Sequence, residues 1–387
     1  MRRLGVAVAL LVAGCPGGAG KPIAPSPEAA SANEDPATHF AHLLTELQDD
    51  ILTSYDRDDP PDIDTGMIVA RIGTARIGAG PGDAYLAGDL ARAPSRWPLD
   101  VEHSTRTEVR SKQLQIHIAA DQSAAWMSDE LSWRITMCGR VAVVPLRITA
   151  LYAHDGDRWV PVFEHLSFGW TPSASEVVPP KQIKTEVVSG DLRDELSGVL
   201  SRGLLRTPHD PLVVAQDASA LVLGAEMADE WHGPQVLLAR IPPGRLEDRR
   251  VGTVGRNADD ATIAYWVGNY SADIAERPGF AARKVGLRET HVFEKRPLAG
   301  AGGDKAPRTC ARDPRPGAQQ QPPPDCRWVL VQSHLSQPIT DDDLANKVFG
   351  TVLMSPKPLA FDCRDGTLVR VPEAAPRRGA GPATGTP

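Results

Sequence analysis

A ten-residue segment that occurs twice constrains this 387-residue chain more than any other feature. Residues 158–167 read RWVPVFEHLS and residues 327–336 read RWVLVQSHLS, so seven of the ten positions are identical. A repeat with so long a period indicates duplicated domains, because the units of solenoids are only about 20–50 residues long. A chain of this length can also hold two domains of ordinary size. The sequence therefore predicts two tandem copies of one domain.

The N-terminus predicts export and a lipid anchor. Residues 1–14 begin with Met1 and two arginines and continue as a short apolar stretch, which is typical of a signal peptide and too short for a membrane-spanning helix. Cys15 follows the segment LVAG. This arrangement resembles the lipobox of bacterial lipoproteins, in which the cysteine is acylated and becomes the first residue of the mature protein. The resemblance implies that acyl chains on Cys15 insert into membrane lipid.

The same region bears on localisation and partners. Pro16 follows the cysteine, in place of the Asp that retains many lipoproteins in the inner membrane. The lipoprotein rule then implies a cell-envelope protein at the outer membrane, on its periplasmic or surface face. The formal net charge is −7 and becomes more negative once Arg2 and Arg3 are removed. Nucleic acid is not an expected partner, because binding it needs a basic surface.

The domain organisation follows from the duplication and from stretches rich in Pro, Gly and small polar residues. In the second copy a low-complexity segment replaces the tight turn of the first, between two strands that are expected to pair. The predicted parts are, in order, a signal peptide (1–14), a flexible tether (15–37), a first domain (38–170), a linker (171–190), a second domain (191–355) with an insertion (296–325), and a disordered tail (372–387).

Each copy is expected to start with a helix and continue as antiparallel strands. Apolar residues recur at helical spacing over residues 39–52, and a second helix is expected over 191–200 with Asp191 as its N-cap. The period then changes, and turn residues separate apolar runs. Asp155-Gly156-Asp157 predicts a tight hairpin. The expected strands of the first copy are 68–72, 113–118, 124–131, 141–151 and 159–166.

Further matches outside the ten-residue segment align the two copies. On this alignment Trp266 corresponds to Trp126, and Arg288 to Arg147. His334 corresponds to His165. The spacing from the tryptophan to the arginine is 21 residues in one copy and 22 in the other.

The first copy resembles the SnoaL-like proteins of the ketosteroid isomerase and nuclear transport factor 2 superfamily. The likeness is carried by AWMS (125–128), RIT (147–149), DGDRW (155–159) and HLS (165–167), and it extends over about residues 38–170 and again over 195–350. It implies an α+β fold with two tandem cone-shaped domains, each a curved antiparallel sheet packed on N-terminal helices. Members include isomerases, polyketide cyclases, dehydratases and proteins without catalytic activity, so the fold does not decide the function.

Two kinds of polar residue are candidates for chemistry. His165 and His334 occupy the same place in both copies and are either imidazoles in a cavity, able to act as a base, or histidines buried and hydrogen-bonded within the sheet. Ketosteroid isomerases need a carboxylate base and a tyrosine. Asp129, Glu130 and Tyr152 match that requirement only by residue type, and solvated positions at a sheet edge are the alternative.

Five aromatic residues are candidates for the wall of a ligand cavity, with core packing as the alternative because large aromatics mostly supply burial. No cofactor and no metal site are expected, since the cysteine spacing of a zinc site and a dinucleotide fingerprint are both missing. The five aromatic candidates are Trp126, Trp159, Phe163, Trp266 and Trp328.

The remaining cysteines allow three disulfide pairings in an oxidising compartment. Cys310 and Cys326 bracket a loop rich in Pro, Gln and Gly. Their closeness in the sequence favours a bond between them, and a bond between Cys138 and Cys363 then stays open.

The sequence therefore favours a membrane-anchored lipoprotein that binds a small apolar ligand or a protein partner without catalysis. The alternative is an isomerase, cyclase or dehydratase that uses a cavity histidine or carboxylate as its general base. Because single domains of the resembled superfamily often dimerise through their sheets, the two copies are also expected to pack as an intramolecular pseudo-dimer.

Overall fold

A computed structural model describes sixteen strands and two helices. The chain consists of two compact units, Met1–Leu43 and Leu44–Pro387, and both large sheets belong to the second unit. Cys15, Cys138, the predicted strand 68–72 and the tail 372–387 lie outside the described residues. The described residues are 35–56, 75–86, 106–137, 140–155, 158–170, 186–187, 190–203, 215, 220–225, 227–233, 244–254, 261–274, 283–297, 310, 326–340, 343–344, 360–364 and 367–371.

Two helices bury one stripe each. In α2 (Pro36–Asp56), Leu47, Ile51 and Tyr55 are buried at intervals of four residues. In α4 (Gly190–Gly203), Leu196 and Val199 are buried, and the helix packs against the second sheet. The two predicted helices are thus confirmed. Asp191, the expected N-cap, lies in the first turn of α4.

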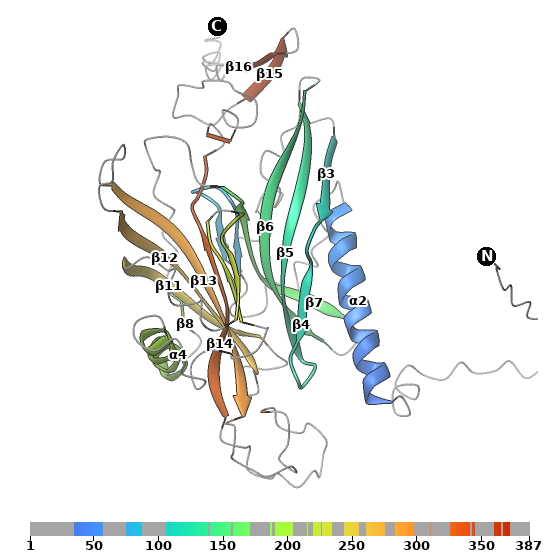
Figure 1. Cartoon of the computed structure of the whole chain (residues 1–387), viewed down its shortest axis with the longest axis vertical. Helices are drawn as coiled ribbons and strands as arrows, with labels where there is room; N and C mark the ends of the chain where they lie inside the picture. Colours follow the sequence, from blue (N-terminus) through green and yellow to red (C-terminus); the bar gives the residue numbers. More distant parts are fainter. Residues whose placement is uncertain are drawn as a thin grey trace, which may run out of the picture. The chain divides into compact units, whose positions relative to one another are not determined.

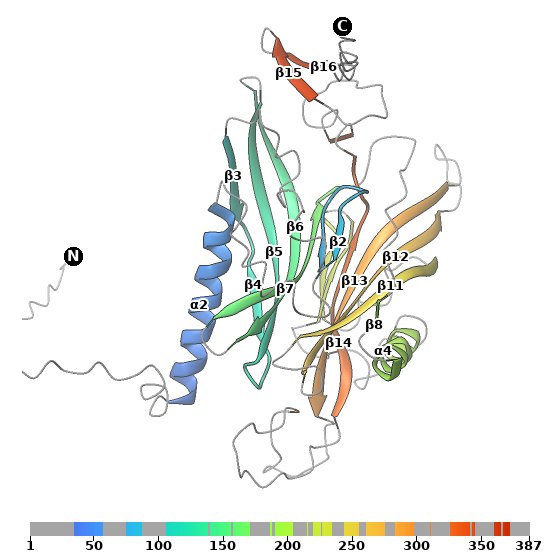
Figure 2. The ribbon, with the colours of Figure 1, turned by 180° about the vertical axis from the view of Figure 1, so that it is seen from behind.

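The first sheet has the strand order β2-β1-β7-β6-β5-β3, with β4 also paired to β5. Its long central strands are neighbours in Figure 2. β6 and β7 pair antiparallel, as the predicted hairpin requires. The strands are β1 (Ala75–Ile77), β2 (Ala84–Leu86), β3 (Arg106–Ser111), β4 (Gln115–Ile118), β5 (Ala124–Met137), β6 (Arg140–His154) and β7 (Trp159–Phe168).

The second sheet has the order β10-β9-β14-β13-β12-β11-β8, and Figure 1 shows α4 beside it. Two further strands, β15 (Ala360–Arg364) and β16 (Thr367–Val371), form a separate hairpin. The strands of the second sheet are β8 (Glu186–Val187), β9 (Leu221–Leu223), β10 (Glu230–His232), β11 (Gly244–Val254), β12 (Ile263–Ile274), β13 (Arg283–Pro297) and β14 (Cys326–Ser336).

The two sheets repeat one topology, including a parallel pair that the sequence did not predict. Ile77 of β1 lies opposite His165 of β7, and Leu223 of β9 lies opposite His334 of β14. The strand pairs β1–β7 and β9–β14 are parallel, whereas the other neighbouring strands in the first sheet are antiparallel. Each sheet is therefore mixed, and the prediction of a purely antiparallel meander is wrong for these two strand pairs.

The predicted fold class is wrong. Strands account for 58% and helices for 20% of the described residues, and these residues do not show two tandem cone domains packed on N-terminal helices. The physical reason is visible in β6, where consecutive side chains from Ala150 to Ala153 are all buried, so both faces of the strand are covered. Contacts between the two sheets supply part of this burial, which the prediction had assigned to helices.

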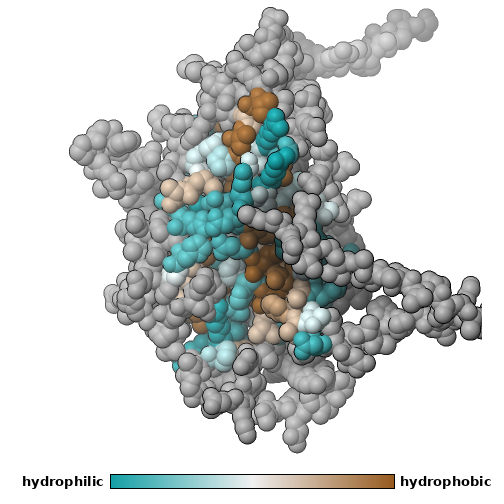
Figure 3. Space-filling model, turned by 45° about the vertical axis from the view of Figure 1, so that its right-hand side comes forward, coloured by the Kyte–Doolittle hydropathy of each residue, from teal (hydrophilic) through white to brown (hydrophobic). Residues whose placement is uncertain are grey.

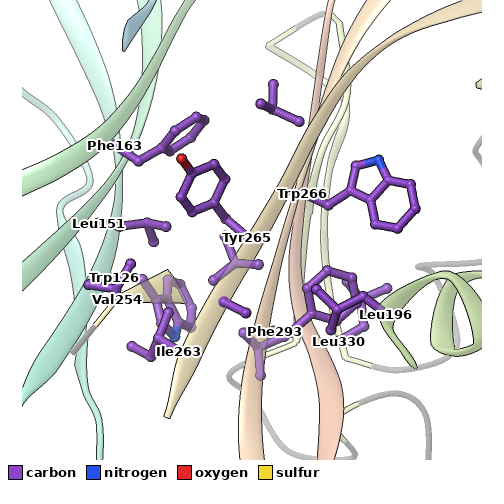
Figure 4. Packing of buried hydrophobic residues seen from close by; sticks show 14 of the residues in the cluster. Trp126, Leu151, Phe163, Leu196, Val254, Ile263, Tyr265, Trp266, Phe293 and Leu330 are labelled. Carbon is purple, nitrogen blue, oxygen red and sulfur yellow. The ribbon is translucent and has the colours of Figure 1, made fainter. Parts of the chain in front are cut away.

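The hydrophobic core combines residues of both sheets. Phe163 of β7 stacks on Tyr265 of β12, with 4.5 Å between ring centroids. Figure 4 shows these two rings facing each other, and it shows Trp266 pointing instead toward Leu196 of α4. Other buried members of the cluster include Trp126, Leu151, Val254, Ile263, Phe293 and Leu330.

A difference in hairpin length changes the alignment of the two tryptophans. Arg147 pairs with Glu130, 17 positions earlier, whereas Arg288 pairs with Asn269, 19 positions earlier. Counting back from these pairs, the structural counterpart of Trp126 is Tyr265 and not Trp266. A slip of one residue moves a side chain to the opposite face of a strand, which is why Trp266 faces α4.

The surface of the described residues is mixed in character. Figure 3 shows hydrophobic and hydrophilic residues next to each other on one face. The large exposed apolar side chains are Val141 and Val143 near the start of β6, and Phe40 in α2. Among the described helices, none combines the length and the apolar character needed to cross a membrane.

The structure contains a disulfide between Cys310 and Cys326, the pair that the sequence favours. The Cα atoms are 6.0 Å apart, and 16 positions separate the two residues. Since Cys326 is the first residue of β14, the bond ties one point of the predicted insertion 296–325 to the sheet.

Candidate functional site

His165 of β7 and His334 of β14 meet between the two sheets. Both side chains are fully buried, and their rings stack with 4.0 Å between centroids. The Nδ1 atom of His165 lies 2.9 Å from the Thr290 hydroxyl, and its Nε2 atom lies 2.8 Å from the Ser336 hydroxyl. Both ring nitrogens of His165 therefore have hydroxyl partners from the second copy.

His334 makes the reciprocal contacts with the first copy. Its Nδ1 atom lies 3.0 Å from the Thr149 hydroxyl, and its Nε2 atom lies 2.9 Å from the Ser167 hydroxyl. The amide of Gln332 also donates to Thr149 Oγ1 at 2.9 Å. Because Thr149 and Ser167 correspond to Thr290 and Ser336, the arrangement is nearly symmetric.

The electrostatics keep both rings neutral. Burial, the neighbouring His334 and the Arg288 cation lower the pKa of His165 well below its ordinary value. Burial and the Arg147 cation lower the pKa of His334 to about 3. A neutral ring that is fully buried and bonded at both nitrogens is suited to holding two sheets together. Its nitrogens have no lone pair left for a substrate.

Two arginines complete the contact between the sheets. Arg288 is fully buried and donates to the carbonyl oxygens of Gly78 at 2.6 Å, Gly80 at 2.8 Å and Pro81 at 2.9 Å. Burial lowers its pKa to about 10, although Asp83 and then Tyr85 raise it. The guanidinium thus remains charged and bonds the loop that follows β1.

Arg147 makes the corresponding bonds to the loop that follows β9. It donates to the carbonyl oxygens of Gly224 at 3.0 Å, Met227 at 2.8 Å and Asp229 at 3.2 Å, and to the Glu130 carboxylate at 3.0 Å. The contacts of the two histidines and two arginines between the sheets are here called the seam.

The structure does not bring the carboxylate candidates together with the tyrosine. Asp129 and Glu130 are consecutive on β5 and point to opposite faces of the sheet. Burial raises the pKa of Asp129 despite hydrogen bonds from Ser111 and from the Gln113 amide, which is 3.1 Å from Oδ1. Glu130 pairs with Arg147 in the seam. Tyr152 is buried, with 8% of its surface exposed.

The five aromatic candidates are all buried, with no more than 5% of any side chain exposed. Trp126, Phe163, Trp266 and Trp328 belong to the hydrophobic core. Trp159 packs against His154, with 4.8 Å between ring centroids. Their positions fit the interpretation of core packing, which the sequence analysis had weighed against a cavity wall.

A second buried polar group lies on the other face of the second sheet, and the sequence analysis did not single it out. Glu289 and His291 alternate on β13, and Ser333 lies opposite His291 on β14. His291 Nδ1 is 2.7 Å from the Ser333 hydroxyl, and His291 Nε2 is 2.6 Å from Glu289 Oε1. These three residues are here called the Glu289 cluster. At most 2% of any of the three is exposed.

The Glu289 cluster is not fully satisfied. Although His291 Nε2 and Glu289 Oε1 are close, neither atom has an aligned hydrogen bond. Buried polar atoms in folded proteins nearly always have one. Within the described ranges, no third His, Cys, Asp or Glu joins the two to make a metal site. The cluster therefore presents a titratable pair with unused hydrogen-bonding capacity.

The surroundings of the cluster are apolar, and they differ from the first copy. The residues that lie opposite its three members in the strand ladder are Trp266, Gly268, Leu335 and Val222. When the copies are aligned on Arg147 with Arg288 and on His165 with His334, the positions of Glu289, His291 and Ser333 are taken in the first copy by Ile148, Ala150 and Glu164. The cluster belongs to the second copy alone.

A sequence signal for the cluster exists but is weak. Glu289 and His291 are two residues apart and so must share a face if the segment is a strand. Ser333 joins them only through the register between β13 and β14, which lies across the insertion. The sequence did not fix that register.

Comparisons with known proteins add little. No family model matches the chain, and neither does any curated protein. Among solved structures, the chain is similar to a protein described as a calcium/calmodulin-dependent kinase II association domain from Exiguobacterium sibiricum, with 13% identity, 35% of this chain and 95% of that chain covered, and a TM-score of 0.24. It is also similar to LinA, with 14% identity, 38% and 97% covered, and a TM-score of 0.25. Scores this low carry no argument about fold or function.

Proposed function

We propose that this protein is a membrane-anchored lipoprotein that binds a small apolar ligand or a protein partner, and that its seam has a structural and not a catalytic role. One observation carries the proposal. The two histidines that the sequence offered as general bases are fully buried, and each of their four ring nitrogens lies within hydrogen-bonding distance of a hydroxyl.

The same contacts support the proposal of an intramolecular pseudo-dimer. In a two-fold interface, a residue of one copy contacts its partner in the other copy and the reverse contact also occurs. His165 with Thr290 and His334 with Thr149 follow that rule. Solution scattering of the full chain should fit one body in which the halves are in contact, and a fit that needs two separated bodies would contradict the pseudo-dimer.

The membrane anchor is a separate part of the proposal and rests on the sequence around Cys15. In the native host, wild type should incorporate labelled fatty acid and sediment with the membranes. Cys15→Ser should do neither while keeping its fold. Fatty-acid labelling of Cys15→Ser equal to that of wild type would contradict the anchor.

Ligand binding is tested on protein purified from its own host. Native mass spectrometry of the delipidated full chain should reveal a bound compound beyond the mass of the polypeptide and its acyl chains. A polypeptide mass without any adduct, together with a stable complex with another envelope protein, would favour the protein partner over the ligand.

A further inference from the structure

The Glu289 cluster contains two atoms whose hydrogen-bonding capacity is unused although they are buried. Glu289 is 2% exposed and His291 is 0% exposed, so bulk water does not serve them. Neither Glu289 Oε1 nor His291 Nε2 has an aligned hydrogen bond. Buried polar atoms of this kind are rare in folded proteins, and an ordered water or a bound group is one explanation for them.

The geometry of the cluster restricts the chemistry of that occupant. The Ser333 hydroxyl, 2.7 Å from His291 Nδ1, can donate to this nitrogen, which leaves the ring hydrogen on Nε2. Nε2 is then a donor, and Oε1 of Glu289, 2.6 Å away, is an acceptor. A single hydroxyl placed beside both atoms accepts from one and donates to the other.

The surroundings restrict the rest of the occupant. Trp266 lies opposite His291, and the Phe293 ring is 6.4 Å from the His291 ring between centroids. Leu335 lies opposite Glu289 on one side, and Gly268, which has no side chain, lies opposite it on the other. A water beside both atoms would have only these two polar partners, the lower end of the two to four that buried waters have. An apolar body attached to the hydroxyl would in addition contact the apolar neighbours.

We propose that Glu289, His291 and Ser333 form the polar end of a ligand site on the α4 side of the second sheet. The ligand is a small alcohol or phenol with an apolar body. This inference rests on the proposed function, in which the protein binds a small apolar ligand, and it assigns that ligand a site and a polar group.

The asymmetry between the copies supports this assignment. The first copy keeps the same strands with Ile148 and Ala150 at the positions of Glu289 and His291. A sheet of this topology therefore does not need an acid and an imidazole there. A bound ligand explains why the second copy has Glu289 and His291 at these positions.

The first test uses small probes on the full exported chain. Phenol and cyclohexanol offer a hydroxyl on an apolar ring, and toluene offers a ring of similar size without the hydroxyl. Titrations followed by ¹⁵N NMR of the histidine rings should show phenol and cyclohexanol shifting the His291 nitrogens. Toluene should bind about tenfold more weakly or not at all.

The second test uses variants of the cluster. Glu289→Leu and His291→Phe should each weaken phenol binding by about tenfold or more while changing toluene binding by less than about threefold. Glu164→Gln, at the first-copy position that matches Ser333, is the control and should bind phenol as wild type does. If the larger changes impair folding, Glu289→Gln keeps the size of the side chain and should still weaken phenol binding.

The outcomes separate this site from the proposed function. A compound that copurifies with wild type and is retained by Glu289→Leu overturns the site and leaves ligand binding intact. Equal binding of phenol and toluene, or equal phenol binding by wild type and Glu289→Gln, also overturns it because the occupant is then water or nothing. If no compound copurifies and no probe binds, the site is overturned and the proposed function is left with a protein partner in place of a ligand.

Discussion

The seam and the Glu289 cluster both bury a histidine beside a serine, but they differ in how completely the histidine is bonded. In the seam, His165 has a hydroxyl on each ring nitrogen, from Thr290 and Ser336. In the cluster, His291 has one such hydroxyl, and its second nitrogen approaches the Glu289 carboxylate without an aligned bond.

This difference helps to separate groups that maintain the fold from groups that are available to a ligand. The seam contains the same arrangement twice. The hydroxyls of Thr149 and Ser167 contact the ring nitrogens of His334, and those of Thr290 and Ser336 contact the ring nitrogens of His165. The cluster is built once. A contact that both copies need is explained by folding, whereas buried polar atoms without an aligned hydrogen bond in only one copy have to be explained by something other than the shared fold.

The largest expected effect is the loss of an arginine of the seam. Arg288→Met removes the donor to three carbonyl groups, on Gly78, Gly80 and Pro81. Since a buried polar group left without a partner costs about 1–3 kcal/mol, the free energy of unfolding should fall by at least about 3 kcal/mol. Urea denaturation followed by tryptophan fluorescence measures it. Arg110→Met is the control, because that side chain is 72% exposed and should change stability by no more than about 0.5 kcal/mol.

A smaller loss is expected from the histidines of the seam. His165→Phe leaves the hydroxyls of Thr290 and Ser336 without their ring nitrogens and should cost about 2–4 kcal/mol. Because the two rings stack, the effects of His165→Phe and His334→Phe should not add, with a coupling of about 0.5–3 kcal/mol in a double-mutant cycle. Strict additivity would mean that the two rings do not act as one unit.

Acid should weaken the seam at a pH where most carboxyl groups are still ionised. The folded-state pKa of His165 is well below the ordinary value and that of His334 is about 3, while an unfolded histidine titrates near pH 6.5. The stabilisation is therefore complete above about pH 6.5. It falls below that pH, because the unfolded chain takes up protons that the folded rings exclude, and for His334 it continues to fall to about pH 3.

The measurement compares wild type with His334→Gln in urea at pH 7 and pH 5.5. Each histidine should contribute a loss of at most about 1.4 kcal/mol per pH unit, so wild type should lose more stability than the variant over this interval. Arg288 stays charged in both proteins, and Asp129 is common to both. Equal losses of stability in wild type and His334→Gln would show that His334 does not cause the pH dependence.

Much of the local structure could be predicted from the sequence because it depends on local patterns. Apolar spacing gave the helices α2 and α4, and alternation with turn residues gave β5, β6 and β7. The strands β1 and β9, which pair in parallel with β7 and β14, have three residues each, which is too short for a pattern to appear. The fold class was wrong because the burial of a sheet face by another sheet is a tertiary fact that no local pattern contains.

The candidate site was harder to predict for a related reason. Trp126 and Trp266 were aligned because both are tryptophan. The hairpin of β12 and β13 is longer than that of β5 and β6, however, and the counterpart of Trp126 is therefore Tyr265. The sequence analysis named His165 and His334 without their partners, since Thr290 and Ser336 come from the other sheet. The Glu289 cluster needs the register between β13 and β14, which the insertion between them hides.

The smallest expected effect, and the one that distinguishes the two regions most clearly, is the replacement of Glu289 and His291 by apolar residues. The double variant Glu289→Leu/His291→Phe removes a buried ionisable pair that has no aligned hydrogen bond. Exchanging such a pair for well-packed apolar side chains is often neutral or stabilising by about 1–4 kcal/mol. In the absence of ligand, the free energy of unfolding of the double variant should therefore be unchanged or higher, whereas every change in the seam lowers it. A loss as large as that of Arg288→Met would mean that the cluster maintains the fold as the seam does, and the contrast between the two regions would disappear.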